Sequence, residues 1–262
     1  MYKKYLVVAS RMDRAGYNIV LQLTQFGKFD TYIVDDEIIY TRNLNLNLIK
    51  EYDFIIFASK HQSERKMKTL SVHPVGNWKT AEYGGVNGKV GKSSAMFMKQ
   101  AFEKLTKNAK EHNLDSYSVT MESTHHGPLI DKPSMFIEIG ATENEWRDTK
   151  AAFVVAKTIS QMINEFKENP YNEIVIGIGG PHYCPGFNRI QGETNVAISH
   201  IIPEYALPLT EEMIKEAIAK TQEELDFVII DWKGVGKSEE RQKIIDILDK
   251  NYIQHKRTSE VK

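Results

Sequence analysis

Short runs of apolar residues recur along the chain and predict buried β-strands. The runs are rich in β-branched residues and are bounded by polar or turn-forming residues, which favours strands over helix segments. We expect strands at residues 5–9, 31–34, 54–58, 135–139, 174–178 and 227–230.

Apolar residues at helical spacing occupy the intervals between these strands. Short polar side chains satisfy the free N–H groups at a helix start, so they mark where the helices should begin. We expect helices to begin at the Ser93/Ser94 pair, at Thr142, at Thr210 and at Ser238. Glu145 completes a capping box with Thr142, and that helix should continue to about residue 163.

Strands that alternate with helices are typical of an α/β fold. We therefore expect a mixed, largely parallel central sheet flanked by helices. Of the 262 residues, 41% are hydrophobic, which is enough to form the core of one α/β unit over residues 1–262. Insertions around residues 60–130 leave room for a smaller subdomain.

Composition and charge restrict where the protein acts. The single cysteine excludes a disulfide framework and predicts a cytoplasmic location. No apolar run is long enough to cross a bilayer, so we expect no membrane partner. The net charge of −1 gives no general support for nucleic-acid binding. An RNA-binding protein would need a local basic patch, and the lysine-rich runs at 60–68 and 79–92 could form one, although a solvated surface is the simpler explanation of each.

Three segments interrupt the alternation of strands and helices, at residues 70–94, 121–133 and 179–208. They are rich in Gly, Pro, His and Asn, and loops at strand ends are where the sites of α/β proteins lie. Six of the 8 histidines lie in or beside loops of this kind: His61, His73, His125, His126, His182 and His200. One such histidine is most often structural, but six of them predict a shared site, because histidine titrates near neutrality and is the commonest metal ligand.

The sequence Met-Glu-Ser-Thr-His-His-Gly-Pro occupies residues 121–128. Glu122 precedes His125 by three residues, and its carboxylate could bind a metal, orient an imidazole or act as a general base. In an extended backbone His125 and His126 would point to opposite sides, one into the site and one bracing it. The alternative is a turn stabilised by Ser123 and Thr124; we favour the functional interpretation.

The sequence Gly-Ile-Gly-Gly-Pro-His-Tyr begins at residue 177 and follows an expected strand. Its glycines expose backbone N–H groups, and His182 would stand at the end of the strand, unless the segment is only a turn that reverses the chain. Glu138 lies within an apolar run. It is either a buried carboxylate with a partner or a water-facing residue of an edge strand, and the sequence favours neither.

The sequence contains no Cys-x-x-Cys pair, HExxH motif or EF-hand loop. Any metal would therefore be held by His, Asp and Glu side chains, a set that suits zinc in an open catalytic site. The expected ligands are several of His61, His73, His125, His126 and His182, with Glu122 as ligand or base.

Taken together, these segments resemble the archaeal and plant D-aminoacyl-tRNA deacylase family. The motifs at 121–128 and 177–183 are specific, and supporting matches lie at 59–64, 72–78, 82–85, 137–146 and 200–205. The resemblance implies zinc-dependent hydrolysis of the ester of D-aminoacyl-tRNA, which releases a free D-amino acid and tRNA. It also implies a fold akin to those of peptidyl-tRNA hydrolases and nucleoside phosphorylases.

On this hypothesis the partner is the acceptor end of D-aminoacyl-tRNA, and no obligate protein partner is inferred. Water activation would fall to the metal with Glu122, His125 and His182, while the N–H groups of Gly179 and Gly180 would stabilise the oxyanion. The remaining expected substrate contacts are Lys60, Trp78, Glu138, Tyr183, His200 and Lys233. Lysines would meet phosphates, and the last base would stack on Tyr183 or Trp78.

Two other classes of protein stay open at this point. A zinc amidohydrolase or nucleoside phosphorylase-like enzyme acting on a small molecule would share the histidine cluster but would need no basic surface. A tRNA-binding module without activity would leave the histidines scattered or buried in hydrogen bonds. The distances among the six histidines and the distribution of surface charge distinguish these alternatives.

Overall fold

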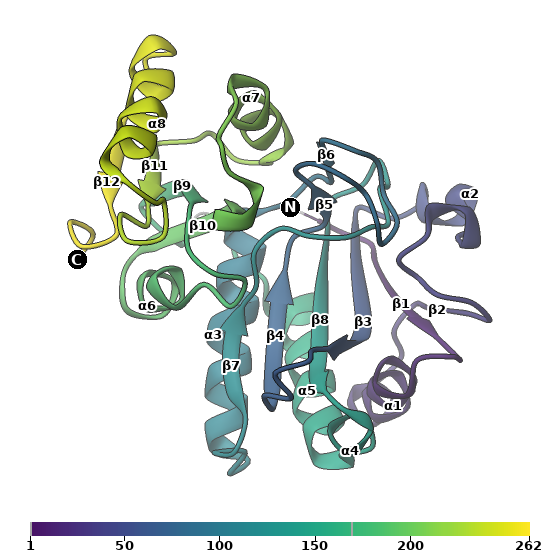
Figure 1. Ribbon diagram of the computed structural model, residues 1–262. Helices are drawn as coiled ribbons and strands as arrows, with labels where there is room; N and C mark the ends of the chain where they lie inside the picture. The colour runs from purple at the N-terminus through teal and green to yellow at the C-terminus, as the bar shows by residue number, and fades with distance from the viewer. Residues whose placement is uncertain (1, 169) are drawn as a thin grey trace.

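The computed structural model describes residues 2–168 and 170–262, which form two β-sheets with helices between and around them (Figure 1). The first sheet has the strand order β2-β1-β3-β8-β4-β7. Its strands are β1 (Tyr5–Ser10), β2 (Thr31–Val34), β3 (Phe54–Gln62), β4 (Thr69–His73), β7 (Ser118–Met121) and β8 (Ser134–Ala141). All neighbours in this sheet pair in parallel except β4 and β8, so the sheet is mixed and largely parallel, as expected.

The second sheet is wholly parallel and has the order β10-β9-β11-β12. Its strands are β9 (Glu173–Ile178), β10 (Val196–Ile202), β11 (Phe227–Ile230) and β12 (His255–Arg257). A short ribbon of β5 (Gly76–Asn77) and β6 (Lys89–Val90) lies in the connection that follows β4. This second sheet is an addition to the mixed, largely parallel central sheet that we expected.

Helices cover one face of the first sheet and both faces of the second (Figure 1). The first sheet is covered by α1 (Arg14–Leu23), α3 (Ala95–Glu111) and α5 (Thr149–Glu165), with the short α4 (Glu143–Trp146) at its end and α2 (Leu46–Ile49) at its margin. Helix α3 also packs on β10, so it lies between the two sheets. The second sheet is covered by α6 (Pro185–Glu193) on one face and by α7 (Glu211–Lys220) and α8 (Ser238–Lys250) on the other. Single 3-10 turns occupy Thr24–Phe26, Thr41–Asn43 and Glu204–Ala206.

The strands and helix starts predicted from the apolar pattern are present, with local differences. Ser94 and Thr210 cap α3 and α7 as expected, whereas α8 is capped one residue early, at Lys237. The helix expected from Thr142 onward breaks into α4 and α5, because Asp148 accepts two backbone N–H groups and starts a new helix. The segment 179–208 contains α6 and β10 in addition to loops.

Strand alternation gives the first sheet one apolar face and one mixed face. In β8, Ile137 and Ile139 belong to the apolar core beneath the helices, so Phe136 and Glu138 point to the opposite side. Among the described residues, no helix is long and apolar enough to cross a membrane. The mixed face, which the helices leave uncovered, carries the candidate site.

Candidate metal centre

Four side chains of the candidate site come from the strands β3, β4, β7 and β8 or the residue that follows them. Glu138 lies opposite Ser59 on one side and Ser71 on the other, and these positions share one face of the sheet. His61 lies two residues after Ser59 in β3, and His73 lies two residues after Ser71 in β4. Both histidines therefore lie on this same face. Glu122 directly follows β7, and its N–H donates to the carbonyl of Val72 (3.0 Å).

The segment 122–127 folds over this face and closes it. The N–H of Ser123 donates to the carbonyl of His182 (2.9 Å), and that of Thr124 to the carbonyl of Ile201 (3.1 Å). Both acceptors belong to the second sheet or the loop after β9. The loop thus binds the two sheets together and leaves Glu122 and Glu138 almost wholly buried, at 0% and 2% exposure.

The two buried carboxylates each face several imidazoles. The carboxylate of Glu122 lies 3.2 Å from His61 Nδ1, 3.2 Å from His182 Nε2 and 3.6 Å from His125 Nε2. The carboxylate of Glu138 lies 3.6 Å from His61 Nδ1 and 3.5 Å from His73 Nε2. Buried carboxylates are expensive unless paired, so Glu138 is the partnered, buried group and not a water-facing edge residue.

Backbone carbonyls hold three of the imidazoles by their outer nitrogens. His73 Nδ1 lies 3.1 Å from the carbonyl of Pro74, His125 Nδ1 lies 2.8 Å from that of Ser123, and His126 Nδ1 lies 2.6 Å from that of Gly127. A carbonyl at Nδ1 accepts a hydrogen bond from that nitrogen and leaves Nε2 directed inward, which is how metal-binding histidines are commonly oriented.

The inward-facing atoms form three overlapping groups in which the ligand atoms lie within 4.8 Å of one another. The groups are His73 with His125 and His126, His61 with Glu122 and His182, and His73 with Glu122 and Glu138. Glu122 Oε1 and His73 Nε2 are buried and have no hydrogen bond of good geometry among the described residues. Two orphaned buried atoms in a set of nitrogen and carboxylate donors fit a bound zinc ion. We call these seven residues the candidate metal centre.

Charges within the candidate metal centre displace the pKa values of its members in opposite directions. Burial disfavours the charged form of Glu138, but hydrogen bonds from His61 and His73 outweigh it and lower its pKa to about 2. Burial also opposes protonation of His61, yet the carboxylates of Glu122 and Glu138 raise its pKa to about 12. Burial, reinforced by the neighbouring His73, lowers the pKa of His126 to about 4. In the absence of a metal, protons on buried imidazoles therefore balance the carboxylates.

The adjacent histidines do not point to opposite sides, as an extended backbone would require. His126 has a φ of 40°, in the left-handed region, which reverses the chain at that residue. The rings of His125 and His126 have centroids 4.4 Å apart, and both residues belong to the same group around His73. The sequence motif thus supplies two members of the candidate metal centre instead of one member and one brace.

Several expected site residues lie outside the candidate metal centre. The N–H groups of Gly179 and Gly180 already donate to the carbonyls of Ile202 and Gly234, so they do not face the imidazoles. Lys60 falls on the opposite face from His61, where its Nζ lies 5.2 Å from the ring centre of Trp146. Lys233 is an exposed residue of the turn between β11 and α8.

His200 and Trp78 form a neighbouring structural pair. The imidazole of His200 is fully buried and its Nδ1 lies 3.2 Å from Thr124 Oγ1. The indole of Trp78 is 6% exposed and donates to the carbonyl of Ile201 (3.1 Å). These contacts hold the segment that carries His125 in place. Contrary to our expectation, the indole ring of Trp78 is too buried to stack on a nucleic-acid base.

Two tyrosine hydroxyls and one serine complete the surroundings of the candidate metal centre. The hydroxyl of Tyr183 lies 2.8 Å from His61 Nε2, and that of Tyr205 lies 3.0 Å from Ser123 Oγ. We expected a contact with substrate for Tyr183 alone. Ser123 lies in the motif at 121–128 and Tyr205 in the supporting match at 200–205, but nothing in their spacing indicated that they would meet.

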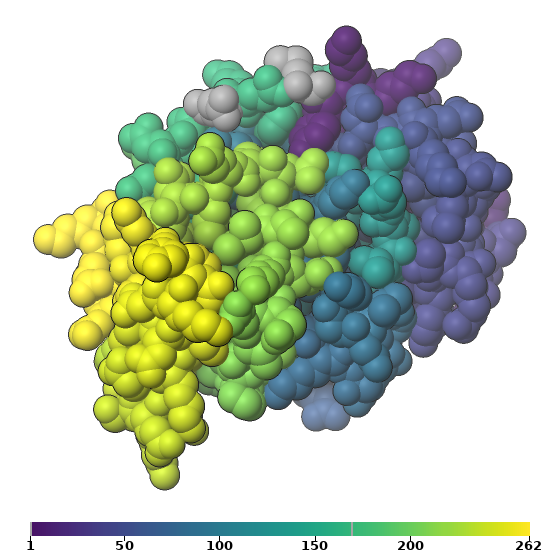
Figure 2. Space-filling view, turned by 90° about the horizontal axis from the view of Figure 1, so that it is seen from above, coloured from purple at the N-terminus to yellow at the C-terminus, as the bar shows by residue number. Residues whose placement is uncertain are grey.

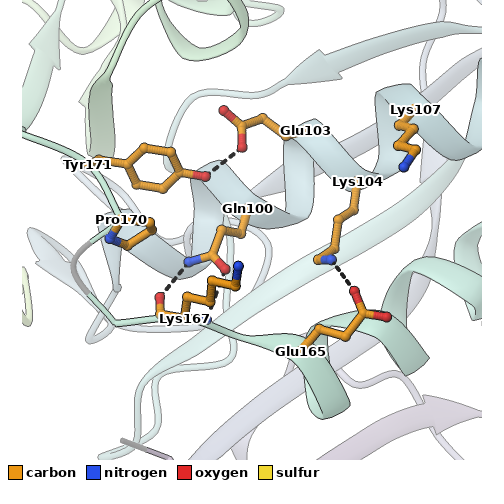
Figure 3. Close-up of a pocket in the computed structure, with 8 residues that line it drawn as sticks. All are labelled: Gln100, Glu103, Lys104, Lys107, Glu165, Lys167, Pro170 and Tyr171. Atoms are coloured by element: carbon orange, nitrogen blue, oxygen red, sulfur yellow. Dashed lines mark hydrogen bonds and ion pairs between the residues drawn. The ribbon is translucent and has the colours of Figure 1, made fainter.

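Of two surface cavities lined by described residues, one adjoins the candidate metal centre. A cavity of about 270 Å³ is lined by His125 and by parts of segments 76–82 and 204–206. A cavity of about 350 Å³ lies elsewhere, between α3 and the segment after α5 (Figure 3). Its charged and polar groups are already paired, Lys104 with Glu165 and Tyr171 with Glu103, so it offers fewer free groups to a ligand.

The fold and the site define an α/β protein with a buried histidine–carboxylate centre beside an open cavity. A family model described as D-aminoacyl-tRNA deacylase matches residues 48–256, and the chain belongs to this family. It is 36% identical to the D-aminoacyl-tRNA deacylase of Thermococcus onnurineus, over 90% of this chain and 93% of the relative. The relative from Archaeoglobus fulgidus is also 36% identical, over 89% of both chains. A crystal structure of a conserved protein of unknown function is similar over 98% of this chain and 96% of the other, with 30% identity and a TM-score of 0.89.

Proposed function

We propose that this protein hydrolyses the ester bond of D-aminoacyl-tRNA in the cytoplasm and releases the free D-amino acid and tRNA, assisted by zinc. The observation that carries the proposal is the convergence of His61, Glu122 and His182 with the group around His73 on one buried face, beside a cavity. Family membership supports the substrate class, and the donor set supports the metal.

The candidate metal centre suits zinc for a reason independent of the family. Its members are imidazoles and carboxylates, and backbone carbonyls hold three of the imidazoles from behind. Among the described residues, Glu122 Oε1 and His73 Nε2 are buried without a hydrogen bond of good geometry. When bound, zinc supplies a Lewis acid and lowers the pKa of water to roughly 7. His61, His73, Glu122, His125, His126, Glu138 and His182 are the residues that would hold it.

Other groups of the chain would complete the reaction. Because the N–H groups of Gly179 and Gly180 are engaged, we assign stabilisation of the developing oxyanion to the hydroxyl of Tyr183. His61 Nε2 lies 2.8 Å from this hydroxyl and holds it at the edge of the candidate metal centre. Glu122 has its carboxylate turned to three imidazoles, and this geometry favours a role as ligand and orienting group over that of a free general base.

The experiment that tests this proposal compares D- and L-tyrosyl-tRNA with the purified protein, with and without a chelator. Hydrolysis of the D-ester alone, abolished by chelation and restored by zinc, is the expected result. If both esters remained intact in the presence of zinc, the proposal would be rejected in favour of a hydrolase or phosphorylase that acts on a small molecule. Hydrolysis that persisted after the protein had been stripped of zinc would reject the metal-assisted mechanism alone.

A further inference from the structure

The cavity of about 270 Å³ beside the candidate metal centre has a wall of fixed aromatic and polar groups. Its lining includes Asn77, Trp78, Thr80, Glu82, His125 and Tyr205. His125 belongs both to this wall and to the candidate metal centre. A group bound in the cavity therefore lies next to the place where we put the reacting bond.

The two sides of the cavity are tied together by hydrogen bonds between distant segments. Lys79 Nζ donates to the carbonyl of Leu207 (2.7 Å), and Trp78 Nε1 donates to the carbonyl of Ile201 (3.1 Å). The segments at 76–90 and 204–216 also lie side by side (Figure 2). Lys89 Nζ lies 3.0 Å from the carboxylate of Glu216. The cavity is thus formed before any ligand enters, so little ordering is required on binding.

Tyr205 presents its ring to solvent while its hydroxyl is held in place. The residue is 57% exposed, and its hydroxyl lies 3.0 Å from Ser123 Oγ. Ser123 follows Glu122 directly, so a residue adjacent to the candidate metal centre holds the hydroxyl of Tyr205. A fixed and exposed aromatic ring is a stacking platform for a nucleic-acid base.

We propose that this cavity binds the terminal adenosine of the tRNA, with its base stacked on the ring of Tyr205. The inference rests on the proposed function, in which the ester joins a nucleoside shared by all substrates to an amino acid that varies. A rigid wall with fixed polar groups such as Asn77, whose Nδ2 donates to the carbonyl of Gly84 (2.9 Å), suits the invariant part. Because His125 belongs to both the cavity wall and the candidate metal centre, the ribose ester of an adenosine bound in the cavity would lie next to the candidate metal centre.

The test measures binding of adenosine 5′-monophosphate to the full chain by calorimetry. We expect the wild-type protein to bind it and Tyr205→Ala to bind it about tenfold more weakly, because one base–aromatic stack is lost. Tyr252→Ala is the matched control, since Tyr252 is 96% exposed in the turn after α8, and it should bind as the wild type does. The KM for D-tyrosyl-tRNA should rise in Tyr205→Ala and not in Tyr252→Ala.

The outcomes separate this inference from the proposed function. Equal binding of the nucleotide by Tyr205→Ala and wild type would overturn the inference, and so would deacylation by a protein that binds no nucleotide. A change in preference between D-tyrosyl- and D-alanyl-tRNA without weaker nucleotide binding would place the amino acid in the cavity and also overturn it. Nucleotide binding that depends on Tyr205 in a protein without deacylase activity would support the cavity assignment while the proposed function failed.

Discussion

The carboxylate of Glu122 lies 3.2 Å from Nδ1 of His61, although two strands separate β3 from β7 in the sheet. The contact forms because both side chains rise from the same face and the segment after β7 turns back across it. Glu122 thereby becomes the acidic centre of a set of imidazoles that enter from three different parts of the chain.

Replacement of Glu122 by Gln should weaken the binding of zinc. The amide keeps the size but removes the charge that faces His61, His125 and His182, so we expect zinc affinity to fall at least tenfold. Zinc content per chain after dialysis measures the effect, with circular dichroism to verify folding. The control is Glu111→Gln, whose carboxylate is half-exposed on α3 and should retain wild-type zinc content. Full zinc content in Glu122→Gln would show that the acidic group is not a ligand.

Removal of the Tyr183 hydroxyl should reduce the rate of reaction and leave zinc binding intact. If this hydroxyl stabilises the oxyanion, Tyr183→Phe should lower kcat about 10²-fold with little change in KM. Steady-state kinetics on D-tyrosyl-tRNA, together with the zinc content of the same sample, distinguishes this role from support of His61. A proportional loss of zinc would identify Tyr183 as a positioning residue for that imidazole.

His200 should make the metal-free protein sensitive to acid. Burial lowers its pKa to about 3, so the folded state keeps it neutral while the unfolded state protonates near pH 6.5. Its contribution to stability is present above pH 6.5 and is lost as the pH falls toward 3. Between pH 7 and 5 the loss amounts to about 2 kcal/mol. The free energy of unfolding in urea should be measured at pH 7 and pH 5, and its change between the two should be smaller in His200→Gln than in the wild type by this amount. The control His255→Gln, at a partly exposed site, should show the same change as the wild type.

Lys99 should stabilise the junction of the two sheets despite its buried charge. Its side chain is fully buried in α3, and its Nζ donates to the carbonyls of Gln191 and Thr194 at the end of α6. Burial lowers the pKa of Lys99, but these bonds still satisfy two carbonyls that the helix leaves free. We expect Lys99→Met to lower the free energy of unfolding by about 1–3 kcal/mol. The control Lys107→Met, at a 73% exposed position on the same helix, should change it by less than about 0.5 kcal/mol.

The sequence predicted β3 and β8, which carry His61 and Glu138, but it missed β4, β7 and β10. Strand β8 was predicted from its apolar run even though Glu138 lies inside it. Strands β4 and β7 were missed because they are short and mix polar residues such as Ser71 and Thr120 with apolar ones. Those polar residues face the candidate metal centre, so the chemistry of the site weakened the signal for the elements that form it.

The sequence could predict that the histidines of the candidate metal centre lie near one another, but it could not predict in which direction each side chain points. Five of the expected histidines do converge, because glycine- and proline-rich segments follow the strands that carry them. Adjacent strand residues face opposite sides, but which of Lys60 and His61 faces the site depends on the register of β3 with β8, which a single sequence does not specify. The inward turn of His126 depends on a left-handed residue that has no marker in the sequence.

The position of His182 also has a consequence for biosynthesis. This histidine lies 60 residues beyond Glu122, so at about 5–20 residues per second it leaves the ribosome roughly 3–12 s later. Until then the nascent chain can pair the strands of its first sheet but cannot complete the set of donors around Glu122. On the proposed function, the group of His61, Glu122 and His182 could accept a metal only after His182 had been synthesised, whereas the two groups around His73 would be available earlier.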